Sequence, residues 1–169
     1  MKKVLTFLAL LAIPFVLMAQ KEFHDARIHM ATGHIKSITA SVMGTSRVIT
    51  FTHDGKMMQE GMSNPIYDAK GYLQSMSFSV EGMPSTVKYK WENGRVTSSV
   101  LNVMGTIITT KHTYDEKGAN IMDVLIMKEQ EIQTQYSDYK YDERGNWISR
   151  KAYMAGQTIE NTRKIEYYK

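Results

Sequence analysis

The stretch Gly82–Gly94, which reads GMPSTVKYKWENG, contains the pattern that decides the fold. Within it, Val87, Tyr89 and Trp91 alternate with polar residues, and a Glu-Asn-Gly sequence follows at once. Alternation with a period of two predicts a strand with one apolar face and one polar face. Asn-Gly is typical of a tight hairpin turn. The segment therefore predicts a strand that ends in a hairpin.

Similar units recur along the chain, at Gly44–Gly55, Gly105–Gly118 and Gln133–Gly145. Each has a strand pattern with an aromatic residue or His near its end, then a polar turn that closes on Gly. A second turn lies between successive units, for example at Ala155-Gly156-Gln157. The sequence thus predicts an all-β fold: an antiparallel β-meander of repeated hairpins, about ten to twelve strands in a single-layer or shallow two-layer sheet.

The N-terminal residues are typical of an export signal. Two lysines precede an apolar run, Val4–Met18, which is shorter than a membrane span and ends next to the small Ala19. We expect residues 1–19 to be a signal peptide and residues 20–169 to be one β-repeat domain; the alternative is an uncleaved N-terminal anchor. A bacterial lipid anchor needs a Cys, and the chain has none. These features predict an exported protein of the periplasm or the extracellular space, with no stable membrane span after cleavage.

Both ends of this domain carry further expectations. Residues 21–34 fit a short helix ending at Gly33 and a leading strand equally well. The last segment, Gln157–Tyr168, alternates charged and apolar residues. Charges on a terminal strand protect a sheet edge against pairing with other chains, so this segment is expected at an edge.

Charge and composition disfavour several functions. The net charge is +4, and two of the lysines lie in the expected signal peptide, so a nucleic-acid partner is not expected. Without Cys there is no thiolate nucleophile or Cys-based metal site. His24, His29 and His34 have a spacing that suits metal binding on neither a helix nor a strand. Since the acidic residues of the turns are explained by turn formation, we expect no metal, no cofactor and no enzymatic activity.

Three segments resemble a known family of repeats. Tyr67–Gly71, Tyr114–Gly118 and Tyr141–Trp147 are similar to the YD repeats of the RHS family, and the resemblance covers about residues 44–150. It implies hairpins laid edge to edge in a long sheet, in an envelope or secreted protein, with carbohydrate binding proposed for some members. The family implies no catalytic residues. This chain is too short to close the family's shell, and its copies at Phe51 and Trp91 lack the Tyr-Asp pair.

The aromatic residues of the last repeat provide the functional hypothesis. Tyr139 and Tyr141 share one face of a strand, and Trp147 and Tyr153 are expected to share the matching face of the next. Together they would form a flat platform for a glycan or for another envelope protein. If another layer covers this face, the same residues are core. The alternative function is a structural or assembly protein of the cell envelope that self-associates through its sheet edges.

Overall fold

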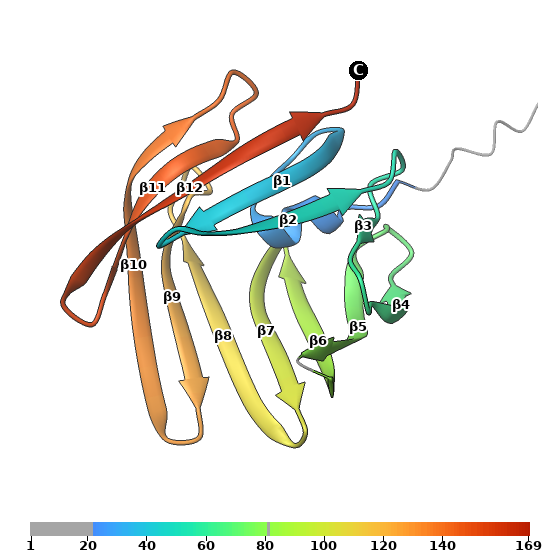
Figure 1. The fold of residues 1–169 in the computed structure, drawn as a ribbon, viewed down its shortest axis with the longest axis horizontal. Coiled ribbons are helices and arrows are strands. Elements are labelled where there is room, and N and C mark those ends of the chain that lie inside the picture. Colours follow the sequence, from blue (N-terminus) through green and yellow to red (C-terminus); the bar gives the residue numbers. More distant parts are fainter. Residues whose placement is uncertain (1–21, 81) are drawn as a thin grey trace, which may run out of the picture.

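A computed structural model describes residues 22–80 and 82–169. It confirms the all-β prediction, because a single antiparallel sheet of 12 strands follows a five-residue 3-10 helix, η1 (Asp25–His29) (Figure 1). The signal peptide lies outside the described residues. The strands are β1 (Ile35–Val42), β2 (Thr45–Phe51), β3 (Met57–Met58), β4 (Ser63–Tyr67), β5 (Leu73–Val80), β6 (Met83–Glu92), β7 (Arg95–Val103), β8 (Thr106–Tyr114), β9 (Asn120–Met127), β10 (Gln130–Tyr141), β11 (Trp147–Met154) and β12 (Gln157–Tyr167).

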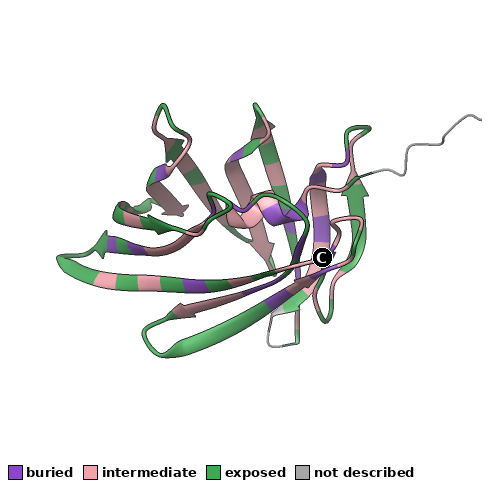
Figure 2. Cartoon of the chain, turned by 90° about the horizontal axis from the view of Figure 1, so that it is seen from above, coloured by how far each residue is buried: buried purple, intermediate pink, exposed green. Residues whose placement is uncertain are grey.

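The two end strands of the chain pair with each other. β1 pairs with β12 on one side and with β2 on the other. The strand order across the sheet is therefore β3-β2-β1-β12-β11-β10-β9-β8-β7-β6-β5-β4. The sheet curves around η1 (Figure 2). The expectation that the last strand forms an edge is wrong, since β12 lies between β1 and β11. The free edges are instead β3 and β4, in the first half of the chain.

The polar turns have the geometry that their acids predict. In the last repeat, Asp142 Oδ1 accepts hydrogen bonds from the backbone N–H of Arg144 (3.0 Å) and of Asn146 (2.8 Å). Asp68 and Asp115 bond the backbone of their own turns in the same way. These bonds close each turn locally, which is how Asp supports a tight reversal of the chain.

An N-terminal segment runs along the row of polar turns. We call residues 22–34, which include η1, the rim segment. Phe23 N–H donates to Asp54 O (2.8 Å), and His24 N–H donates to Gly71 O (3.2 Å). Farther along, the Asn146 amide exchanges two hydrogen bonds with the backbone of Thr32, at 2.8 and 2.9 Å. Of the two expectations for this part of the chain, the helix is the closer one, although it ends before Gly33.

Two turn glycines are required by the closeness of the rim segment. Gly55 and Gly71 both have positive φ angles, of 92° and 88°. A Cβ on Gly55 would overlap the carbonyl oxygen of Phe23, and one on Gly71 would overlap that of Glu22. Glycine is therefore needed there for the conformation and for the contact.

The core lies where the rim segment meets both halves of the curved sheet. It joins apolar side chains of the rim segment, β1–β3 and β5–β6, among which Ile38, Phe51 and Leu73 are almost fully buried. The carboxylate of Asp25 is buried with them, and its Oδ2 accepts hydrogen bonds from Met57 N–H (2.7 Å) and Tyr67 Oη (2.8 Å). Burial is the main reason why the pKa of Asp25 is raised. These contacts fix η1 inside the sheet.

Candidate functional site: an aromatic cleft beside the polar turns

Three of the four aromatic residues expected to form a platform lie together. The rings of Tyr139 and Tyr141 stack with 5.8 Å between centroids and 18° between planes. Trp147 stands edge-on to Tyr139, at 6.3 Å and 84°. Tyr153 is not part of this group. It and Lys151 alternate along β11 with the buried Arg150 and Ala152, so they face the other side of the sheet.

Irregularities in strand pairing explain why the expected platform of four does not form. Between β10 and β11 the register shifts on both sides of Lys140, and Asp138 has a positive φ of 53°. An extra residue on one strand reverses which residues face each side from that point on. Trp147 therefore faces the same side as Tyr139, whereas Ser149 faces the side of Tyr153 and bonds Glu160 (2.9 Å).

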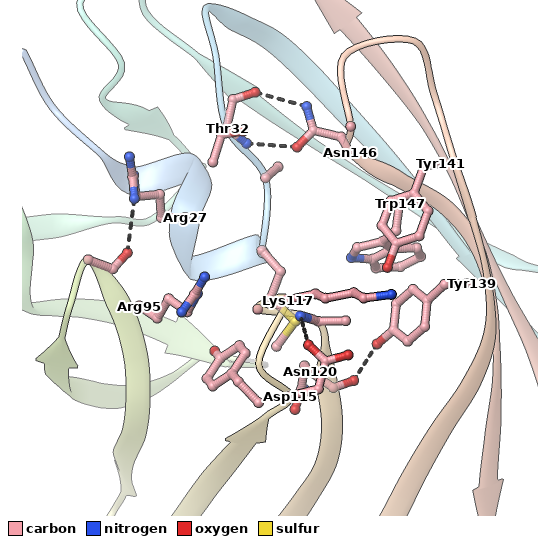
Figure 3. A pocket seen from close by; sticks show the side chains of 17 residues that line it. Arg27, Thr32, Arg95, Asp115, Lys117, Asn120, Tyr139, Tyr141, Asn146 and Trp147 are labelled. Carbon is pink, nitrogen blue, oxygen red and sulfur yellow. Dashed lines mark hydrogen bonds between the residues drawn. The ribbon is translucent and has the colours of Figure 1, made fainter.

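The three aromatic residues border a cleft between the rim segment and the polar turns. Its volume is about 380 Å³, which is within the usual range of small-ligand sites. Figure 3 shows side chains from the rim segment, the β6–β7, β8–β9 and β10–β11 turns and the end of β10 converging on it. The labelled residues are Arg27, Thr32, Arg95, Asp115, Lys117, Asn120, Tyr139, Tyr141, Asn146 and Trp147.

Positive charge predominates around the cleft. Arg27, Arg95 and Lys117 line it, whereas Asp115 is the only acidic residue among its described lining residues. Asp115 already bonds its own turn at Ala119 N–H (2.8 Å). The side chains of Arg95 and Lys117 have no ion pair or hydrogen bond within residues 22–80 and 82–169. In Figure 3, Lys117 extends toward Tyr139 and Trp147.

The Arg95 side chain lies against Gly118, where a side chain at position 118 would leave no room for it. Its guanidinium carbon lies 5.8 Å from the centroid of the Tyr114 ring, a cation–π contact. A Cβ on Gly118 would overlap the guanidinium. The glycine of this turn thus makes room for a cation, whereas the glycines at positions 55 and 71 make room for the backbone of the rim segment.

Two buried arginines pack against the ring of Trp147, and one of them also contacts Tyr139. The guanidinium carbons of Arg163 and Arg150 lie 3.8 and 4.5 Å from the Trp147 ring centroid, and both side chains are buried. Arg150 also donates to Tyr139 Oη (3.0 Å), and burial is the main reason why the pKa of Tyr139 is raised. Trp147 and Tyr139 therefore have fixed orientations before any ligand binds.

Two polar atoms of lining residues have unused hydrogen-bonding capacity. The indole N–H of Trp147 and the Oδ1 of Asn120 are buried, and neither has a hydrogen-bond partner within the described part of the chain. A buried polar group without a partner costs free energy. Tyr141 contrasts with them, because its side chain is 51% exposed. The cleft thus combines the exposed ring of Tyr141 with two lining residues that each contain a buried polar atom without a partner.

A histidine–carboxylate pair that sequence reasoning missed lies on the inner face of the sheet, next to the cleft residue Asn120. His112 Nδ1 and Asp123 Oδ1 are 2.6 Å apart, and Asn120 and Tyr136 also donate to Asp123, each at 2.8 Å. Burial alone would raise the pKa of Asp123, but these hydrogen bonds outweigh it, so the pKa is lowered. The β8–β9 hairpin places His112 opposite Asp123. The turn between these two strands is the sequence feature from which the pair could have been predicted.

The three N-terminal histidines are dispersed along the rim segment. His24 packs on the ring of Tyr72 (4.6 Å), His29 Nε2 lies 3.4 Å from Met57 Sδ, and His34 lies against His53 (5.7 Å). Within residues 22–80 and 82–169, no group of three His, Cys, Asp or Glu side chains is arranged to hold a metal ion.

Comparison with models of known protein families and with curated proteins found no match. In the part of the chain that the structure describes, no helix has the length and apolar character needed to cross a membrane.

Proposed function

We propose that this protein is an exported, non-catalytic glycan-binding module, and that the aromatic cleft is its binding site. The single observation that carries the proposal is the convergence of Tyr139, Tyr141 and Trp147 on a cleft with unpaired cations. The partly exposed ring of Tyr141 suits the apolar face of a sugar ring.

The charges of the cleft favour an acidic glycan. Arg95 and Lys117 are free to pair with a carboxylate or a sulfate, and Arg can bind such groups through two parallel hydrogen bonds. We therefore expect uronic acid residues in the preferred ligand.

The binding test compares two tyrosines that are equally exposed. Tyr141 and Tyr153 are each 51% exposed and lie on opposite faces of the sheet. Acidic oligosaccharides selected on a glycan array are titrated calorimetrically into the purified protein. Tyr141→Ala is expected to weaken binding at least tenfold, and Tyr153→Ala is expected to leave it unchanged. Equal effects of the two variants, or no binding of any glycan by the unmodified protein, would contradict the proposal.

A charge variant tests the acidic preference separately. Lys117→Gln is expected to weaken binding of an acidic oligosaccharide and to leave binding of its neutral, carboxyl-reduced form unchanged. The matched control is Lys88→Gln. Lys88 is exposed and directly follows the buried Val87 in β6, so its side chain points to the opposite face of the sheet. A neutral form that binds as tightly as the acidic one would overturn the acidic preference while leaving glycan binding in place.

Export remains part of the proposal, with cleavage after Ala19. Mass spectrometry of the protein recovered from the periplasm or the medium is expected to give a chain that starts at Gln20. An intact mass of residues 1–169 in that fraction would favour the uncleaved anchor. We also propose a relation to YD repeats, supported by the equivalent hydrogen bonds that Asp68, Asp115 and Asp142 each accept from the backbone N–H four residues on.

Assembly through sheet edges has less support from the geometry. The edge strand β3 has only two residues, and β4 contains Pro65 and pairs irregularly with β5. Short or interrupted edge strands are a common way of preventing edge-to-edge pairing. A monomeric mass at all concentrations in light scattering is the result expected on this reasoning.

A further inference from the structure

The buried core fills only part of the space inside the curved sheet. Met76 and Val87, on the inner faces of β5 and β6, belong to the core. The same inner surface continues through Leu101, Ile108 and Leu125 on β7, β8 and β9, and these side chains are only half-buried. A cavity of about 410 Å³ lies over them. It is separate from the aromatic cleft and is mainly apolar.

One cation faces this cavity without a partner. Arg47 is two and four residues before the buried Ile49 and Phe51 in β2, so it shares their inner face of the sheet, and it is exposed. It lines the cavity, and its guanidinium has no hydrogen bond or ion pair among residues 22–80 and 82–169. An arginine at the border of an apolar cavity provides a site for one negative charge.

The other titratable groups at the cavity do not neutralise Arg47. His29 is held neutral, because burial and then the charges of Arg163 and Arg47 lower its pKa to about 4. His112 has its Nδ1 bonded to Asp123, and both carboxylate oxygens of Asp123 already accept hydrogen bonds. The positive charge of Arg47 therefore remains available to a ligand.

We propose that this inner cavity binds an amphiphile that has one apolar chain and a carboxylate head. The chain lies on Leu101, Ile108 and Leu125, where its burial removes apolar surface from water on both sides. The carboxylate pairs with Arg47. The volume of the cavity is in the range found for small-ligand sites, and the pairing of one apolar surface with one charge distinguishes this ligand from the glycan of the cleft.

Decanoate and decanol are the probes for a calorimetric test on the purified protein. Decanoate is expected to bind once per chain. Arg47→Gln is expected to weaken decanoate binding about tenfold, because one charged hydrogen-bonded pair is lost, and to leave decanol binding unchanged. The matched control, Lys88→Gln, removes a charge from the outer face of a strand that lines the cavity. Since Arg47 and Lys88 are both exposed, neither variant is expected to affect folding.

Methyl NMR spectra locate the ligand directly. Decanoate is expected to shift the methyl signals of Leu101, Ile108 and Leu125. No decanoate binding, or equal affinities of the native and Arg47→Gln proteins, would overturn the proposal. Binding that Tyr141→Ala abolishes and that leaves these methyl signals unshifted would place decanoate in the cleft instead. A dimer in light scattering that decanoate does not dissociate would assign the cavity to a second copy of the chain.

Discussion

Replacing Gly71 by Ala tests whether the rim segment depends on the turns beneath it. Gly71 and Gly145 end equivalent Asp-x-x-Gly turns, with φ angles of 88° and 79°. Placing an L-residue in this left-handed region costs roughly 1–2 kcal/mol at either position. A Cβ on Gly145 meets no atom within 4 Å, whereas one on Gly71 overlaps the backbone carbonyl of Glu22. The two variants therefore differ only in their effect on the rim segment.

The additional cost at Gly71 follows from the contacts that must shift. Moving the backbone of Glu22 away disturbs the hydrogen bonds from His24 N–H to Gly71 O and from Phe23 N–H to Asp54 O. Each contributes about 1 kcal/mol to stability. We therefore expect Gly71→Ala to lower the free energy of unfolding by roughly 3–4 kcal/mol, and Gly145→Ala by roughly 1–2 kcal/mol.

Urea unfolding followed by circular dichroism measures the difference. With unchanged m values, a lower midpoint reports lost stability alone. In thermal unfolding, a difference of about 2 kcal/mol corresponds to roughly 4–8 °C for a chain of this size. If Gly71→Ala and Gly145→Ala have the same midpoint, the rim segment does not rest on the turn at Gly71 and the argument from close approach is refuted.

Three further variants test other contacts. Gly118→Ala is expected to displace Arg95 and so to weaken binding of acidic oligosaccharides in calorimetry; unchanged affinity would argue against a role for this arginine. Tyr114→Phe, which removes the hydrogen bond to Val96 O (2.8 Å), is expected to lower the free energy of unfolding by about 1 kcal/mol in urea titrations. Burial followed by nearby arginine charges lowers the pKa of His29 to about 4, below the value near 6.5 of the unfolded chain, so stability is expected to fall as pH drops from about 7 to 4. His29→Leu is expected to flatten this dependence, and identical pH profiles would contradict it.

The local features of the fold are predictable because they are encoded in short segments. The alternation around Val87 and Tyr89 and the turn at Asp142–Gly145 each specify a strand or a hairpin without information from the rest of the chain. The pairing of β1 with β12 is different. It joins residues such as Thr39 and Lys164, and no local pattern identifies that partnership. For this reason the sequence does not predict that β3 and β4, rather than the last strand, form the free edges.

The candidate site was predictable in part for the same reason. Tyr139 and Tyr141 were grouped correctly with Trp147, because a short turn joins their strands. Tyr153 was assigned to the wrong face, since the positive φ of Asp138 and the shifted register do not show in the residue pattern. The cleft itself also escaped prediction, because it needs the rim segment to lie across turns that are distant in sequence.

The pairing of the first and last strands has a consequence for how the molecule folds. The hairpins from β5 to β12 can form from neighbouring residues as soon as those are available. β1 cannot complete its ladder until β12 exists, so this closure joins the most distant parts of the chain. Contacts of such long sequence separation slow folding, because the entropy of closing the loop is lost before the contacts form. We expect the β1–β12 closure, which also seats Arg163 beneath Met30 and Trp147, to be a late step.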